Sequence, residues 1–260
     1  TVNFYRAVPG KNPEGIAEAV ALTFMGERIG SWEPVRREGL GAFFSMVAYK
    51  GTAEWKEEIV LFDLEKALSN RAENVVLEGL FPDGSSVALD LERDPRQVFT
   101  DWLVEDERFA RNYVNRIWAW LLGRGLVHEA DDLRPDNPAA HPDVLAWLAQ
   151  ELVNHDFDTR HIYRLILNSG TYQLSCEPTP GNVTDETYFS HYLPRRLDAE
   201  VLIDALNQIT GSRESYQSQI PEPFTFVPEH HRSITLGDGS ITSPFLDMFG
   251  RPPRDTGLES

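Results

Sequence analysis

Arginine and acidic side chains in loops and on one helix are the residues in this sequence best suited to bind a ligand. Arginine forms planar, two-pronged pairs with carboxylates, so the identity of its partners decides its role. The functional interpretation is a site for an anion or a sugar acid. The simpler alternative is a set of internal salt bridges that hold loops to helices. The candidate binding residues are Arg111, Asn115, Asp132, Arg195, Arg196, Arg251 and Arg254.

The seven histidines are scattered and match neither a His-x-x-x-His pattern nor the His-Glu-x-x-His helix of metalloproteases. His155 and His161 stand six residues apart, a spacing that predicts side chains on different helix faces. His230 and His231 lie near Asp238, but the side chains of adjacent residues diverge. We therefore predict no metal ligands in this chain.

Nucleophiles and phosphate-binding loops give no clear signal either. No Gly-x-Ser-x-Gly elbow occurs, and the single cysteine, Cys176, is next to Glu177, whose negative charge disfavours a thiolate. Residues 123–125 (GRG) lack the third glycine of a dinucleotide fingerprint and follow a helix, so they predict a helix end. Acidic pairs such as Asp131 and Asp132 are expected by chance in a chain with 41 acidic residues. Since no cofactor-binding motif occurs, we predict no cofactor.

Composition excludes several classes of partner. The 260 residues include 24 Lys or Arg against 41 Asp or Glu, which gives a formal charge of −17. This charge argues against nucleic acid and anionic lipid, because both need a basic surface. The lone cysteine excludes an internal disulfide, a thiolate zinc cluster and a Cys-x-x-Cys-His haem anchor. No stretch approaches the roughly 18 consecutive apolar residues of a membrane span, so we expect no membrane insertion.

The elements that would position these residues are mostly helical. Apolar residues at helical spacing predict helices over residues 13–25, 38–48, 94–104, 106–122, 142–154, 159–168 and 197–210. Strands are predicted over residues 55–62, 73–80 and 85–91, inside a small β-containing insert at 52–91. Beyond Gly211 the many prolines indicate loops. The predicted fold is mainly α: a helical bundle-like domain with this insert and a long irregular C-terminal segment.

The tryptophans divide into two groups. Four of them lie in predicted helices, where their spacing favours the core: Trp102, Trp118, Trp120 and Trp147. The other two, Trp32 and Trp55, lie outside the main helical region, where an aromatic ring can stack on a sugar.

Four segments of the second half form an ordered series of motifs: FARNYVNRIWAWLLGRGLVHEADDLRPDNP, HPDVLAWLAQELVNHDFDTRHIYRLILNSGTYQLS, LPRRLDAEVLIDALNQITG and FLDMFGRPPRDT. This series resembles an uncharacterised C-terminal domain of planctomycete-type cytochrome c-associated proteins. They cover about residues 94–256, and the candidate binding residues all stand at positions that match the family's motifs. The resemblance names relatives and supplies no reaction, because the family's activity is not established.

The N-terminal part resembles the end of a companion domain that precedes this one in the same proteins. Its motifs are VNFYRA, AEAVALTFMGERI and GLGAFF, within residues 1–50. We therefore predict two domains, at residues 1–93 and 94–260. The companion domain commonly carries a Cys-x-x-Cys-His stretch, whereas the corresponding residues 30–37 (GSWEPVRR) contain neither cysteine nor histidine. Neither end of the sequence has a clear terminal element, so we expect this chain to be part of a longer protein.

Three functions are compatible with these features. The first is a non-catalytic binding or scaffold region of a large exported cell-envelope protein, with a polysaccharide, an envelope protein or the rest of the parent chain as partner. The resemblance alone implies the exported, periplasmic or cell-surface location. The second is a polysaccharide-active enzyme that uses Asp and Arg in loops 128–140, 195–196 and 251–254. The third is an accessory domain to an electron-transfer module, for which the missing haem motif counts against direct haem binding.

Overall fold

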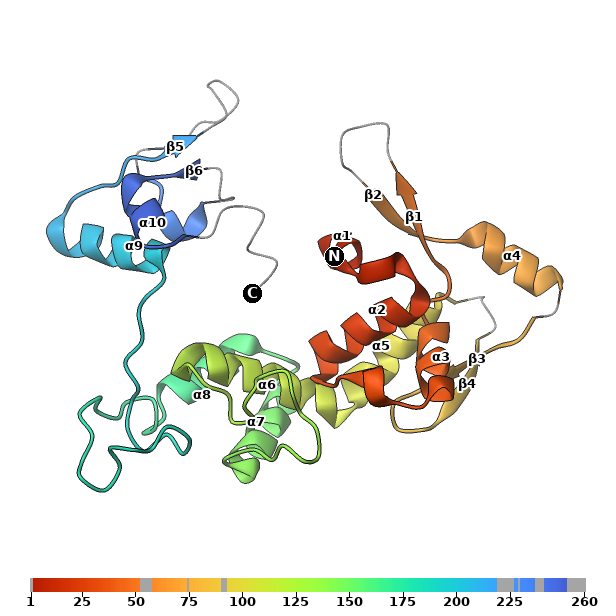
Figure 1. The fold of residues 1–260 in the computed structure, drawn as a ribbon, viewed down its shortest axis with the longest axis horizontal. Helices are drawn as coiled ribbons and strands as arrows, with labels where there is room; N and C mark the ends of the chain where they lie inside the picture. Colours follow the sequence, from red (N-terminus) through yellow and green to blue (C-terminus); the bar gives the residue numbers. More distant parts are fainter. Residues whose placement is uncertain are drawn as a thin grey trace. The chain divides into compact units, whose positions relative to one another are not determined.

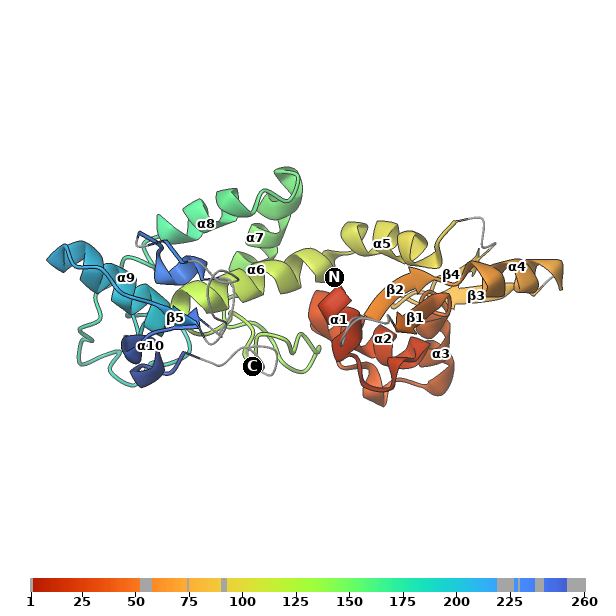
Figure 2. The same cartoon turned by 90° about the horizontal axis from the view of Figure 1, so that it is seen from above.

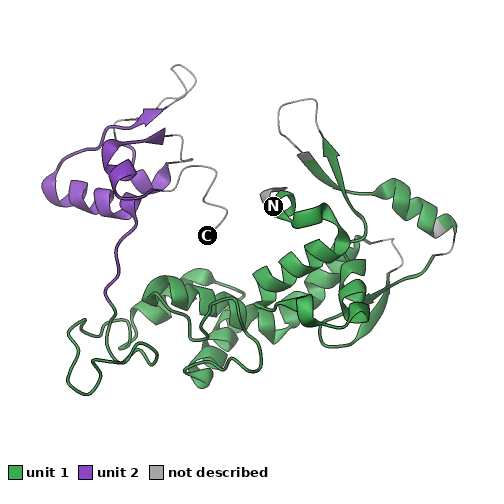
Figure 3. Cartoon of the chain, in the orientation of Figure 1, with its two compact units in different colours: residues 1–193 green, residues 194–260 purple. Residues whose placement is uncertain are grey.

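The computed structural model has the mainly α fold that the sequence predicts. It describes residues 2–51, 58–73, 75–89, 93–218, 227–228, 230–236 and 241–251. These residues form ten α-helices and three antiparallel two-stranded sheets (Figure 1, Figure 2). The chain divides into two compact units, Thr1–Leu193 and Pro194–Ser260, which Figure 3 shows in different colours. The domain boundary predicted between residues 93 and 94 stays a prediction.

Helices make up most of the first unit, and two small sheets complete it. Its elements are α1 (Val2–Ala7), η1 (Pro9–Lys11), α2 (Pro13–Val20), η2 (Ala21–Met25), η3 (Ile29–Ser31), α3 (Pro34–Ala42), β1 (Val47–Gly51), β2 (Glu58–Phe62), α4 (Leu64–Ala72), β3 (Leu77–Leu80), β4 (Ser86–Leu89), α5 (Pro95–Glu105), α6 (Glu107–Leu122), α7 (Pro142–Asn154) and α8 (Thr159–Leu167). The η2 segment is a π-helical turn that continues α2. β1 pairs with β2, and β3 pairs with β4.

The first hydrophobic core involves α2, α3, α5 and both small sheets. Helix α2 begins at Asn12, whose side chain accepts a hydrogen bond of 2.7 Å from the Gly15 amide and so caps the helix. Its apolar face buries Ile16, Ala17 and Val20. Other buried members of this core are Leu40, Phe43, Phe44, Phe81, Leu89, Phe99 and Leu103.

Helix α6 contributes to two cores. It begins at Asp106, which accepts a hydrogen bond of 2.9 Å from the Arg108 amide, and it ends at Gly123 in a left-handed conformation. Phe109, near its start, packs against the first core, whereas Val114 is buried in the second. Helices α7 and α8 pack against α6 (Figure 1, Figure 2). One continuous helix therefore joins the two halves of the first unit.

The second unit is smaller and less regular. Its elements are α9 (Ala199–Thr210), β5 (Gln217–Ser218), η4 (Ser233–Thr235), β6 (Ile241–Thr242) and α10 (Pro244–Met248). Asp204 on α9 accepts hydrogen bonds from the amides of Ser233 at 2.8 Å and Ile234 at 3.3 Å, which attaches η4 to α9. Across the described parts of both units, no helix combines the length and the apolar character needed to cross a membrane.

The N-terminal region departs from the prediction at three elements, the first of which is α1, a helix with no predicted counterpart. In place of a helix over 38–48, α3 ends at Ala42 and residues 47–51 form β1. Val47 and Tyr49 are β-branched and aromatic, so they suit a strand, and β2 supplies the pairing partner. Helix α4 has no predicted counterpart. Asp63 accepts a hydrogen bond of 3.0 Å from the Lys66 amide and so starts α4 within the segment predicted to be strands and turns.

The other predicted elements are present with shifted ends. The predicted strands appear as β2, β3 and β4, while residues 55–57 and 90–91 lie outside the described part of the chain. All five helices predicted from residue 94 onward are present as α5 to α9.

Two tryptophans are exposed, contrary to the prediction. Trp120 on α6 is 61% exposed and Trp147 on α7 is 51% exposed. Trp118 is buried, as predicted. Residues two apart on a helix point to nearly opposite sides, so Trp118 and Trp120 cannot both face the core. Trp102 packs against the first core, as expected.

Candidate ligand-binding cleft

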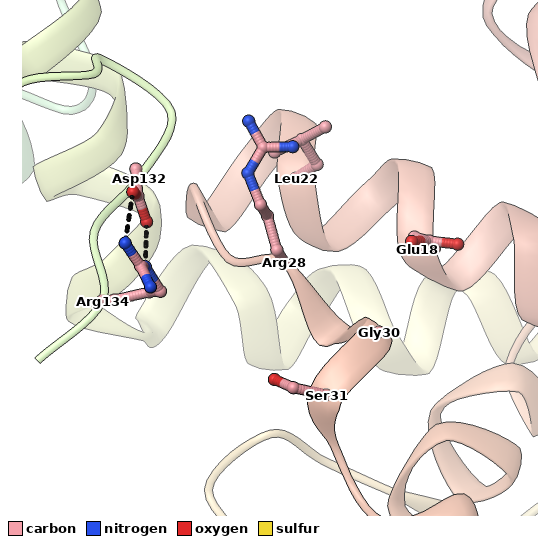
Figure 4. A pocket seen from close by; sticks show the side chains of 7 residues that line it. All are labelled: Glu18, Leu22, Arg28, Gly30, Ser31, Asp132 and Arg134. Carbon is pink, nitrogen blue, oxygen red and sulfur yellow. Dashed lines mark hydrogen bonds and ion pairs between the residues drawn. The ribbon is translucent and has the colours of Figure 1, made fainter.

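A polar cleft lies in the first unit between the α2–η3 region and the loop that follows α6 (Figure 4). Its volume is about 420 Å³, within the range of small-molecule sites. We name it the Arg28 cleft. It is lined by Glu18, Leu22, Arg28, Gly30, Ser31, Asp132 and Arg134.

The first wall of the Arg28 cleft comes from α2, η2 and the turn after them. Glu18 and Leu22 stand four residues apart on this continuous helical segment, so they share a face. Gly26 ends the segment in a left-handed conformation, with φ of 67°, and turns the chain so that Arg28 and Gly30 follow along the cleft.

Close backbone contact joins the two walls. The amide of Leu133 donates a hydrogen bond of 2.9 Å to the carbonyl oxygen of Gly26. A Cβ atom on Gly26 would lie 2.2 Å from Cδ1 of Leu133 and 2.9 Å from Oδ1 of Asn112, so only glycine fits here without movement of its neighbours. The loop wall is therefore held at a fixed position against the N-terminal wall.

Two buried asparagines of α6 hold the backbone on either side of the cleft. Asn112 donates a hydrogen bond of 3.0 Å to the carbonyl of Thr23 in η2. The amide group of Asn115 donates to the carbonyls of Val127, at 3.1 Å, and Ala130, at 3.0 Å. Its oxygen accepts a hydrogen bond of 2.9 Å from the Val127 amide. Asn115 therefore acts as a brace for the loop that ends in the second wall.

An ion pair on the loop wall fixes the charge of Asp132. Arg134 donates two hydrogen bonds to its carboxylate, from Nε at 2.6 Å and from Nη2 at 2.9 Å (Figure 4). These hydrogen bonds lower the pKa of Asp132, and the nearby positive charge of Arg28 adds to the effect. Asp132 is consequently ionised at neutral pH.

The opposite wall carries charged groups that are not paired. Within the described part of the chain, the side chains of Arg28 and Glu18 form no hydrogen bond or ion pair. In the view of Figure 4, Arg28 stands between the Asp132–Arg134 pair and Glu18. Donor and acceptor groups are thus both available to a molecule that enters the cleft.

A second cavity of about 250 Å³ shares Glu18 and Gly30 with the Arg28 cleft, and Arg37 lines it. We name it the Arg37 cavity. Nε of Arg37 is buried and has no hydrogen-bond acceptor among the described residues. A buried donor without an acceptor is unfavourable, and a ligand oxygen is one way to satisfy it. The Arg28 cleft and the Arg37 cavity together provide polar groups over a longer stretch than either alone.

Three of the residues proposed from the sequence lie in the first unit, and one of them lines the cleft. Asp132 is that residue. Asn115 is fully buried and all its hydrogen bonds go to backbone atoms, which fits a bracing role. Arg111 pairs with Glu107 at 3.5 Å across one helical turn, and its Nε atom is buried without an acceptor among the described residues.

The other four proposed residues belong to the second unit. Arg195 and Arg196 are exposed on an extended segment before α9. Arg251 is 7% exposed, and its Nε donates to Oε1 of Glu200 at 2.9 Å. It also donates to the carbonyl of Ile241, so it braces the second unit. Arg254 lies outside the described residues.

Several residues of the cleft carry no recognisable signal in the sequence. Arg28 lies in a short polar link, Glu18 occupies an ordinary exposed helix position, and Arg134 is one of many charged residues in a polar loop. Their proximity depends on the contact between Gly26 and Leu133, which are more than a hundred residues apart. Gly26 itself was detectable only as a helix end.

The larger part of the chain matches the model of one protein family. Residues 95–259 match the model of PSD1, described as a protein of unknown function (DUF1553). The chain belongs to this family. The match to PSD1 covers α5 to α10 and, in the first unit, the loop wall of the cleft. No curated protein and no solved structure is similar enough to the chain to count as a match.

Proposed function

We propose that this chain is a non-catalytic binding or scaffold region of a large exported cell-envelope protein. Residues 1–50 are, in this proposal, the end of the companion domain of planctomycete-type cytochrome c-associated proteins. The PSD1 domain follows it. The resemblance of the N-terminal motifs supports the first assignment, and the family match supports the second. The partners are a polysaccharide or an envelope protein, together with the rest of the parent chain.

The balance of positive and negative side chains in the Arg28 cleft and the Arg37 cavity favours a neutral glycan as the ligand. The two cavities are lined by three arginines and three acids, namely Arg28, Arg37, Arg134, Glu14, Glu18 and Asp132. A strongly anionic ligand would meet the three carboxylates, and a cationic ligand would meet the three guanidinium groups. A sugar has hydroxyl groups that both donate and accept hydrogen bonds, so it can use both kinds of side chain without a net charge.

The electrostatics of the loop wall favour binding over catalysis. A glycosidase needs one carboxylic acid with a raised pKa to protonate the leaving group. Arg134 lowers the pKa of Asp132 instead, and Asp131 accepts a hydrogen bond of 2.7 Å from Arg116. Asp131 and Asp132 of the proposed catalytic loop are therefore both engaged as ion-pair partners.

Replacing Arg28 with alanine is expected to weaken glycan binding at least about tenfold, because a charged hydrogen bond to a ligand contributes about 1.5–3 kcal/mol. The measurement is a glycan array with the purified 260-residue chain, followed by calorimetric titration of the best neutral oligosaccharide. Since the ligand is neutral, the wild-type affinity should change little between low and high salt.

Arg160→Ala is the matched control, because Arg160 is an exposed arginine on α8 and does not line the cleft. It should bind the oligosaccharide as the wild type does. Failure of the wild-type chain to bind any glycan on a broad array would refute the glycan assignment. Equal losses in the Arg28 and Arg160 variants would refute the location of the site.

A further inference from the structure

Three side chains that can supply metal-ligand atoms lie close together at the junction of α7 and α8. Glu151 is in the last turn of α7, His155 follows the end of that helix, and His161 is in the first turn of α8. Nε2 of His161 lies 2.9 Å from Oε2 of Glu151, and Nδ1 of His155 lies 3.6 Å from the same oxygen. One ligand atom from each residue lies within 4.8 Å of the other two.

The connection between the helices brings together two histidines that the sequence spacing places on different faces. The expectation of different faces is wrong because the intervening residues are not helical. Asp156 and Phe157 have left-handed backbones, with φ of 50° and 60°, and Asp158 then caps α8. The rings of His155 and His161 consequently stack, with centroids 3.6 Å apart and planes 17° from parallel.

Packing fixes this turn and therefore the ligand positions. Two consecutive left-handed residues other than glycine cost free energy, so they persist only where the surroundings hold them. The ring of Phe157 packs against Phe109 of α6, with centroids 5.7 Å apart. The Phe157 amide also donates a hydrogen bond of 2.9 Å to the carbonyl of Leu152. The turn thus sets the backbone positions of the three candidate ligands before any ion binds, and the two nearly parallel rings must rotate for their lone pairs to point at one ion.

The donor set and its spacing fit a small transition-metal ion. Two imidazoles and one carboxylate suit zinc and its neighbours, and tetrahedral ligands at 2.0–2.1 Å from zinc lie about 3.4 Å apart. The measured separations of 2.9 Å and 3.6 Å fall on either side of this value. We propose that Glu151, His155 and His161 bind one divalent transition-metal ion of the zinc class.

Exposure and the end of α7 shape this site further. Glu151 and His161 are largely covered, whereas the His155 side chain is 45% exposed, so solvent reaches one side of the cluster. That side leaves a fourth position open for water or another ligand. The carbonyl end of α7 also favours a cation. Nδ1 of His155 lies 2.9 Å from the backbone oxygen of Glu151, and metal ligation through Nδ1 replaces that contact.

The test is titration of the chelator-treated 260-residue chain with Zn²⁺ by calorimetry, and with Co²⁺ by visible absorption. We expect one ion per chain and the intense absorption bands of tetrahedral cobalt. Glu151→Gln, His155→Gln and His161→Gln should each weaken Zn²⁺ binding by at least roughly tenfold, since even outer partners of metal ligands change affinity by that factor. Circular dichroism checks that each variant is folded.

His128→Gln provides the matched control. His128 also stands beside a carboxylate, with its Nε2 atom 3.3 Å from Oε1 of Glu129, but among the described residues it belongs to no such cluster. It should bind Zn²⁺ as the wild type does. The proposal fails if the wild-type chain takes up no ion at millimolar Zn²⁺, or if folded variants of the three ligands bind as tightly as the wild type. Either result would leave His161 and Glu151 as an ordinary hydrogen-bonded pair. A loss in His128→Gln equal to that of the ligand variants would also overturn it.

Discussion

Replacing Asn115 with alanine is expected to lower the free energy of unfolding by about 3–5 kcal/mol. The change removes three hydrogen bonds and leaves the buried backbone groups of Val127 and the partly buried carbonyl of Ala130 without their partner. Each such group costs about 1–3 kcal/mol when it stays unsatisfied. Chemical denaturation followed by circular dichroism measures the loss.

Two other asparagines make this prediction specific. Asn112→Ala should cost less than Asn115→Ala, because Asn112 donates one hydrogen bond to the backbone and its oxygen has no partner among the described residues. Asn154→Ala, at an exposed position on α7, should change stability by less than about 0.5 kcal/mol. Equal losses for Asn115→Ala and Asn154→Ala would contradict the bracing role of Asn115.

Replacing Gly26 with alanine is expected to cost about 3 kcal/mol. Part of this loss is backbone strain, because alanine at a left-handed position costs about 1–2 kcal/mol. The remainder comes from the new methyl group, which would lie 2.2 Å from Cδ1 of Leu133, so that this side chain or the loop that carries it must move. Glycan binding should fall along with stability, since the same contact sets the width of the Arg28 cleft.

Gly84→Ala separates the two contributions. Gly84 also has a positive φ, of 91°, but a Cβ atom there would meet nothing within 4 Å. The Gly84 variant should therefore show the strain alone, about 1–2 kcal/mol, with unchanged glycan binding. If thermal unfolding shows equal losses for the two glycine variants, close packing at Gly26 is not the cause of its effect.

Sequence patterns predict the helical framework well because its signals are local. Helix α6 has a cap at Asp106, a stop at Gly123 and an apolar stripe between them, all within one short segment. Helix α7 has a proline in its first turn and an apolar face that buries Leu145, Leu148 and Leu152, so its signals are local as well. By contrast, the predicted helix over residues 38–48 is interrupted because residues 47–51 pair with β2 as strand β1. That pairing depends on a strand that comes later in the chain. Local propensity cannot foresee such a choice.

The binding candidates show the same division. Asp132 was recognisable as part of an acidic loop, but Arg28 and Glu18 have nothing in their neighbourhood that distinguishes them from other surface charges. The histidines illustrate a second difficulty. In the turn between them, Asp156 and Phe157 have left-handed backbones, and neither residue type indicates that conformation as glycine would. Tertiary contacts with Phe109 determine it.

The position of α5 has a consequence for how the PSD1 domain is inherited. The family match begins at residue 95, yet Phe99 and Leu103 of α5 are buried in the core built by the N-terminal segment. A protein trimmed to residues 95–259 would carry these side chains on an uncovered face and would tend to self-associate. Any relative with apolar residues at the positions of Phe99 and Leu103 needs another segment of its chain to cover these side chains. Helix α5 and the N-terminal segment that packs on it are therefore under joint selection. A substitution in one of them changes which substitutions the other tolerates.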